Sequence, residues 1–151
     1  MKKIIHPLAG AFALILIMTF WASTVLVELT GSEAQIIWLK TTLPWAFLAL
    51  IPAMMTTGGS GFSLTGPVKS ARLKRKTKRM KLAAANGIVI LIPAALLLAW
   101  KASRLELDAV FYAVQVIELM AGALNIYLLS RNFADGRAMT SIRRRVKAQA
   151  V

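Results

Sequence analysis

The chain alternates between long apolar runs and shorter polar connections. Four runs of roughly 20 residues are long enough, as helices, to cross about 30 Å of hydrocarbon. They cover about residues 8–29, 36–56, 82–100 and 109–129. Lipid accepts only helices or closed barrels as spanning structures, and the strict alternation of a barrel strand is absent from these runs. The pattern therefore predicts an all-α membrane protein, a single bundle of four transmembrane helices.

The polar connections are too short to form a second domain, so residues 1–151 are expected to make one membrane domain. A basic loop at 57–81, which begins with a flexible Gly- and Ser-rich exit, and a basic tail at 130–151 account for most of the remainder. Asp135-Gly136 predicts a turn in this tail. The first run holds Trp21, ends in Glu28 and lacks an A-x-A site, which favours a retained helix over a cleaved signal peptide.

Composition excludes several other classes of protein. The 151 residues are 58% hydrophobic and yet carry a net charge of +13, with no cysteine. A soluble enzyme needs more polar surface, a secreted disulfide scaffold needs cysteines, and a disordered chain is far less apolar. The high hydrophobic content and the high net charge are compatible because apolar and basic residues occupy different segments of the chain.

The distribution of charge predicts an orientation. Of the 19 lysines and arginines, sixteen lie before the first run, in the second connection or in the tail. The positive-inside rule then places both termini of this multi-pass protein in the cytoplasm. Anionic lipid headgroups are the expected partners of this charge. Nucleic acid is not favoured, because aromatic residues do not alternate with the basic ones. The residues expected to contact lipid are Lys74, Arg75, Lys76, Lys78, Arg79, Arg143, Arg144 and Arg145.

The fourth run carries the clearest candidate site. Gln115, Glu118, Gly122 and Asn125 are spaced three, four and three residues apart, which places them on one helix face. Glu118 lies near the middle of the run, where a carboxylate costs roughly 3 kcal/mol to insert. This polar face is therefore expected to point into the bundle.

Partners for the polar face follow from depth. Thr19 and Asn86 are the expected hydrogen-bonding partners, and no basic side chain is expected at midplane depth, so Glu118 is predicted to be a neutral acid. It could carry a proton, bind a cation or bond a quinone headgroup. The alternative is an interhelical hydrogen bond that only fixes packing.

His6 is the only histidine in the sequence. A haem b would need a methionine as second axial ligand or a histidine from another subunit. Met54 and Met55 lie at a suitable depth, and the same residues could hold copper. The other interpretation is a solvated histidine at the start of the first helix, before Pro7.

Several motifs distributed over most of the chain resemble those of small four-span bacterial inner-membrane proteins of the uncharacterised, hypothetical type. The resemblance implies the same fold and brings no activity or functional residue with it. The motifs are His6-Pro7-Leu8-Ala9-Gly10, Phe20-Trp21, Glu28-Leu29, Arg79-Met80, Ala85-Asn86-Gly87, Gln115 with Glu118, Ala121-Gly122-Ala123 with Asn125, and Asp135-Gly136-Arg137.

Three functions remain open at this point. The first is a binding or accessory subunit that acts through the polar face of the fourth helix. The second is an electron-transfer protein that binds haem or quinone. The third is a proton- or ion-coupled transporter that works as a homo-oligomer or within a larger complex, since four helices make a thin pore wall. No nucleophile–base pair or nucleotide motif predicts an enzyme acting alone.

Overall fold

The computed structural model describes the backbone of residues 2–65 and 71–148 and the side chains of residues 5–60 and 74–138. Nearly all of this chain is helical. The elements are α1 (Lys2–Thr30), α2 (Glu33–Thr42), the 3-10 turn η1 (Leu43–Ala46), α3 (Phe47–Thr65), α4 (Ala71–Asn86), the π turn η2 (Gly87–Leu91), α5 (Ile92–Ser103) and α6 (Ala109–Ala148).

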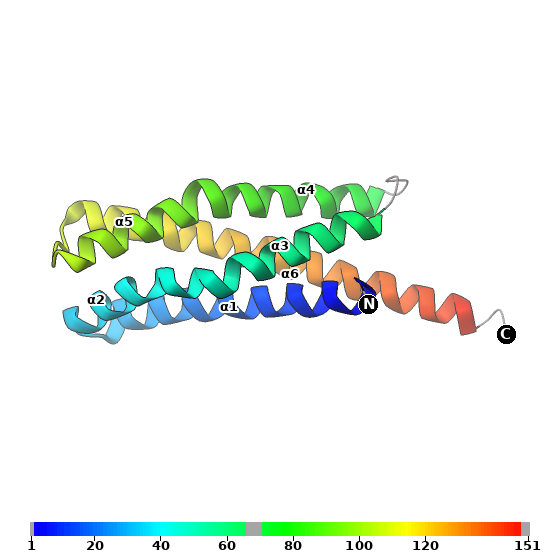
Figure 1. Cartoon of the computed structure of the whole chain (residues 1–151), viewed down its shortest axis with the longest axis horizontal. Coiled ribbons are helices and arrows are strands. Elements are labelled where there is room, and N and C mark those ends of the chain that lie inside the picture. Colours follow the sequence, from blue (N-terminus) through cyan, green and yellow to red (C-terminus); the bar gives the residue numbers. More distant parts are fainter. Residues whose placement is uncertain (1, 66–70, 149–151) are drawn as a thin grey trace.

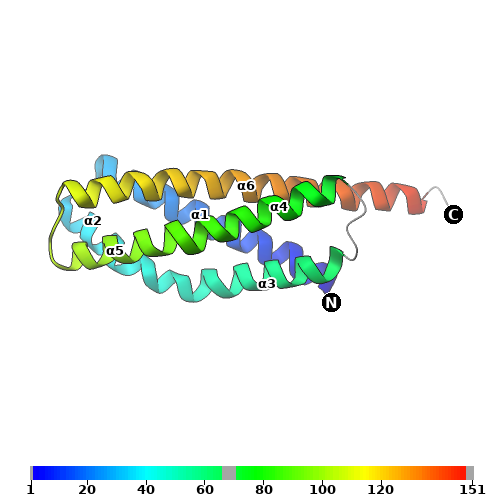
Figure 2. The same cartoon turned by 90° about the horizontal axis from the view of Figure 1, so that it is seen from above.

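These elements form an elongated bundle of four rods (Figure 1). The second rod joins α2, η1 and α3, and the third joins α4, η2 and α5. One end holds the α1–α2 and α5–α6 connections and is called the turn end here. The start of α1 and the end of α6 lie at the other, the terminus end, as Figure 2 also shows. Within the described residues, α1 packs on α3 and α6, α2 on α5, and α4 on α6.

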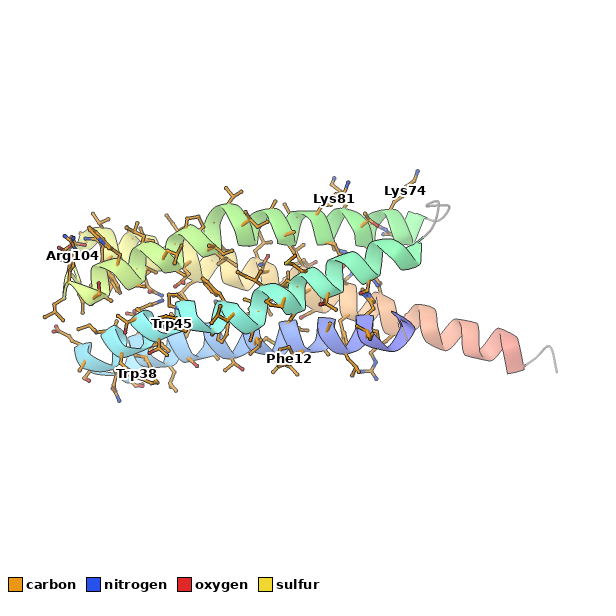
Figure 3. All side chains as sticks on the ribbon, in the orientation of Figure 1. Phe12, Trp38, Trp45, Lys74, Lys81 and Arg104 are labelled. Atoms are coloured by element: carbon orange, nitrogen blue, oxygen red, sulfur yellow. The ribbon has the colours of Figure 1, made fainter. Side chains whose placement is uncertain are left out.

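In the part of the chain that the structure describes, four helical segments are long and apolar enough to cross a membrane: Ile5–Thr30, Glu33–Ser60, Lys74–Ser103 and Ala109–Ala138. Large apolar side chains cover the outside of the bundle, as expected for a surface solvated by lipid. Phe12 and Trp38, for example, are 50% and 67% exposed and point away from the bundle (Figure 3). For the described residues, the prediction of an all-helical fold with four helices long and apolar enough to span a membrane is confirmed.

Prolines explain the interruptions in two rods. Pro44 lies in η1, so the second rod is not one continuous α-helix. Pro93 has no N–H to donate to the turn before it, and that turn widens into η2, where the Ile92 amide bonds to the Gly87 carbonyl oxygen. At Pro52, by contrast, α3 continues as an α-helix.

The helices extend further than the sequence predicted at the terminus end. α3 runs on through the Gly- and Ser-rich segment to Thr65, where a flexible exit was expected. α6 passes through Asp135-Gly136 without the predicted turn and continues to Ala148. Contacts with α4 account for this, because Asp135 and Gly136 both face that helix. Residues 66–70 of the predicted loop lie outside the described residues.

At the turn end, a small apolar core is closed by an ion-paired connection. Ile36, Leu98, Ala102 and Phe111 form the core. Lys101 donates to Asp108 at 2.8 Å and to Glu106 at 3.2 Å, while Asp108 accepts the backbone N–H of Phe111 and so caps α6. Leu105 takes a left-handed φ of 61° to close this turn. The connection therefore fixes α5 and α6 relative to each other.

Candidate functional site

The predicted polar face of α6 is directed into the bundle. Gln115 and Asn125 are only 3% and 2% exposed, and Gly122 is also buried between them. The neighbouring helices of the same chain cover this face. A small species that enters between the helices can therefore reach the polar face of α6. This face is not an outer surface of the bundle.

Glu118 has an ion-pair partner on a different helix. The ammonium nitrogen Nζ of Lys40 lies 2.5 Å from Oε2 of Glu118, and the two side chains are 2% and 12% exposed. The expectation that no basic side chain reaches Glu118, and that it is a neutral acid without a partner, is wrong. Lys40 lies about two turns inside α2, and its four-carbon stem extends the reach of its charge further.

Glu28 adds a second carboxylate to this pair. It lies near the end of α1, and its charge interacts with those of both Lys40 and Glu118. Its Oε1 atom is buried and has no hydrogen-bond partner in the described part of the chain. We call Glu28, Lys40 and Glu118 the charge cluster. It contains two carboxylates and one ammonium group, drawn from three different helices.

A small cavity adjoins the charge cluster. It has a volume of about 70 Å³ and is lined by α1, η1, α3, η2, α5 and α6. Among the described residues, Glu118 is the one ionisable side chain that lines it, and Thr24 and Trp21 add a hydroxyl and an indole. Such a space suits a few water molecules or a small ion, since pockets for drug-sized ligands are about 300–1,000 Å³.

Trp21 and Gly122 form one wall of the cavity by close packing. The indole Nε1 donates to the Leu119 carbonyl oxygen at 2.9 Å. A Cβ added at Gly122 would lie 2.8 Å from Cδ1 of Trp21, closer than packed carbons tolerate. Glycine is thus required where the indole crosses α6.

Of the two predicted partners of the polar face, Asn86 contacts it in the structure and Thr19 does not point toward it. Asn86 Nδ2 donates to Oδ1 of Asn125 at 3.0 Å and to the Ala121 carbonyl oxygen at 2.8 Å. Thr19 is exposed, because it lies two residues beyond the buried Ile17 and so on the opposite side of α1. Thr24, which is 3% exposed, faces the cavity in its place.

Gln115 lies one turn from Glu118 on the same face. Neither of its amide atoms has a hydrogen-bond partner among the described residues, although both are buried. A buried amide without partners costs about 1–3 kcal/mol, so bound water is the natural partner at this position. The polar environment of the charge cluster therefore extends toward the turn end.

His6, one of the three predicted cofactor ligands, contacts α3 near its end. The Nδ1 atom of His6 lies 3.1 Å from both the Thr57 carbonyl oxygen and Ser60 Oγ, so the ring bonds to the backbone turn of α3. Met55 is 70% exposed on the outside of the bundle. The described residues also contain no group of three or more His, Cys, Asp and Glu suited to a metal ion.

The basic residues of α4 divide into two groups. Lys74, Arg75 and Lys78 are exposed, as expected for contact with lipid headgroups, whereas Lys76 and Arg79 are partly buried. The remaining predicted lipid contacts, Arg143, Arg144 and Arg145, have side chains that lie outside the described residues.

The chain matches no protein-family model, and neither a curated protein nor a solved structure is similar to it. The resemblance to uncharacterised four-span bacterial membrane proteins therefore stays a prediction.

Proposed function

We propose that the chain is a proton-binding membrane protein, in which the charge cluster holds one exchangeable proton as part of a proton-coupled process. The supporting observation is the ratio of charges. One buried ammonium group, Lys40, serves two carboxylates, Glu28 and Glu118, and one carboxylate oxygen has no partner among the described residues. With all three groups ionised the cluster carries one excess negative charge, which a single proton neutralises. Neutral arrangements are strongly preferred where the dielectric constant is low.

The adjoining cavity supports this proposal, because it offers space for water beside one carboxylate of the cluster. Water in a space of about 70 Å³ can reach Glu118 and the hydroxyl of Thr24. The binding function predicted for the polar face of α6 is thus kept, with a proton as the ligand and the bundle interior as the place of binding. The inward direction of that face favours this interpretation over the docking of a partner protein.

Orientation determines from which side protons would arrive. The positive-inside rule, applied to the sixteen basic residues before the first span, in the second connection and in the tail, favours a cytoplasmic location for both termini. In this orientation the turn end lies on the outer side of the membrane, with Lys101, Glu106 and Asp108. The charge cluster lies in the outer half of the bundle, since Glu28 is within one turn of the end of α1. We therefore propose that the cluster exchanges protons with the outer side.

A carrier built on this cluster would act as a homo-oligomer or within a larger membrane complex, because four helices enclose too little space for a separate pore.

The experiment that tests the binding step is an infrared titration of the purified protein. A protonated carboxylic acid has a carbonyl band that a carboxylate lacks. We expect one such band to titrate in the wild type and to be lost in Glu28→Gln or Glu118→Gln.

Glu33→Gln is the matched control, because Glu33 is exposed at the start of α2 and lies outside the cluster. It should leave the titrating band unchanged. A wild-type spectrum without such a band would contradict the proposal, as would a band insensitive to both cluster variants. Proton flux into proteoliposomes driven by a potassium gradient then tests the coupling step, with the same three variants.

A further inference from the structure

A second polar cluster lies at the terminus end, where the proton-binding proposal uses no residue. Lys76, Arg79, Ala83 and Asn86 are spaced three, four and three residues apart and form the inward face of α4. Ala83 and Asn86 are 0% and 6% exposed, and the two basic residues continue the same face. The outer basic residues differ, since Lys74 and Lys81 point away from the bundle (Figure 3).

Arg79 is only partly satisfied by the chain itself. Its Nη2 atom bonds Oδ2 of Asp135 on α6. The Nε atom of Arg79 is buried and has no partner among the described residues. An arginine guanidinium prefers to donate from both edges to planar or tetrahedral oxyanions. Nε shares one edge of the guanidinium with Nη2, so this edge is still open to an acceptor at Nε, beside the bond to Asp135.

Lys76 adds a second positive charge to the same place. Its Nζ atom lies 3.4 Å from the position that a Cβ on Gly136 would occupy, so the absent side chain leaves room for the ammonium group. Asp135 and Arg79 both act on it electrostatically. Two cations thus share one carboxylate, and the cluster has a net charge of +1.

Asn132 supplies an independent observation that points to a ligand. It is 7% exposed, and neither amide atom has a partner in the described part of the chain. The pairs Asn86–Asn125 and Lys76–Gly136 fix the antiparallel register of α4 against α6. This register brings Asn132 level with Arg79, one turn from Asp135 on the same helix.

We propose that Lys76, Arg79 and Asn132 bind a phosphate group. The two positive side chains supply charge. The open guanidinium edge of Arg79 and the amide of Asn132 supply hydrogen-bond donors. Phosphate oxygens require both features. The group can belong to an anionic lipid headgroup, since the site lies at the end of the bundle where a headgroup layer would be, or to free phosphate. Both sources offer the same chemistry to these residues.

The experiment measures binding to the full chain in a detergent that contains no phosphate. The two probes are inorganic phosphate and short-chain phosphatidic acid, each followed by thermal stabilisation at constant ionic strength. Saturable stabilisation by either probe supports the proposal, and the two arms identify the source. Binding of phosphatidic acid alone assigns a lipid headgroup, and binding of inorganic phosphate as well assigns free phosphate.

Variants separate the site from general electrostatic attraction. Asn132→Leu removes the amide without changing any charge, and Arg79→Lys keeps the charge that pairs with Asp135 but removes the guanidinium edge. We expect each to weaken binding at least 10-fold. Lys81→Gln, an exposed change on the same helix, should alter it less than twofold. Equal losses in Lys81→Gln and Arg79→Lys, binding unaffected by Asn132→Leu, or no saturable stabilisation by either probe would overturn the proposal.

Discussion

Replacement of Lys40 by methionine is the sharpest test of the charge cluster. The change keeps the length of the side chain and removes the charge that lies 2.5 Å from Glu118. At an effective dielectric constant of about 20, Coulomb attraction at that distance is about 7 kcal/mol. Most of this offsets the hydration that both groups lose. Measured cases show that removal of one partner of a buried pair costs about 3–5 kcal/mol, whereas replacement of both costs little.

We therefore expect Lys40→Met to lower the free energy of unfolding by about 3–5 kcal/mol. The double variant with Glu118→Gln should recover most of that loss. The assay is unfolding by SDS in mixed micelles, followed by circular dichroism at pH 7. The loss in Lys40→Met should shrink as the pH is lowered, by at most about 1.4 kcal/mol per pH unit, because an isolated buried carboxylate takes up a proton.

Two results would refute this reasoning. If the two single variants and the double variant show additive losses, with a coupling energy below about 0.5 kcal/mol, the pair does not form in the membrane. If Lys40→Met is as stable as wild type at every pH, Lys40 is not buried beside a carboxylate. Glu33→Gln serves as the control for loss of an exposed charge.

Three further predictions concern packing, polar contacts and pH. Gly122→Ala should lower stability in the same assay by about 1–3 kcal/mol, because its Cβ meets the Trp21 indole, and the loss should shrink when Trp21 is also replaced by leucine. Asn125→Leu should cost about 0.6–1.7 kcal/mol, since Asn86 loses one of its two acceptors; no loss would contradict the contact. The hydrogen bond from Lys101 lowers the pKa of Asp108 below its usual 3.8. The stability that this interaction contributes is therefore present above pH 3.8 and is lost as the pH falls through the lowered pKa. Thermal unfolding monitored across this acidic range should show a smaller decline in Asp108→Asn, and an identical decline would contradict the assignment.

The four spans and the inward face of α6 could be predicted because they depend on local periodicity. Hydrophobic length defines a span, and the three–four–three spacing from Gln115 to Asn125 defines a helix face without any knowledge of the neighbouring helices. The pairing of Asn86 with Asn125 followed from equal depth in two antiparallel helices. Each inference needs only one helix and a membrane of known thickness.

The charge cluster was missed because a lysine near the edge of a span was assigned to the boundary. The sequence holds a signal that could have found it. Lys40 is four residues after Ile36 and three before Leu43, and both of these apolar residues are buried. Lys40 therefore lies on the inward face of its rod. Thr24 and Glu28 likewise continue the face of Ile17 on α1. Which of these faces meet one another depends on tertiary packing, and no single-helix pattern contains that information.

The π turn between α4 and α5 determines which residues of the third rod face inward. Each extra residue in a turn rotates the remainder of a helix by about 100°. The buried side of α4 contains Ala83 and Asn86, and that of α5 contains Leu98 and Ala102. In a straight helix these two sides would point in directions nearly a quarter-turn apart. The extra residue in η2 realigns them, so one helix contributes both to the polar contacts at the terminus end and to the apolar core at the turn end. Deletion of a single residue there would turn one half of the rod toward lipid while every side chain elsewhere stayed the same.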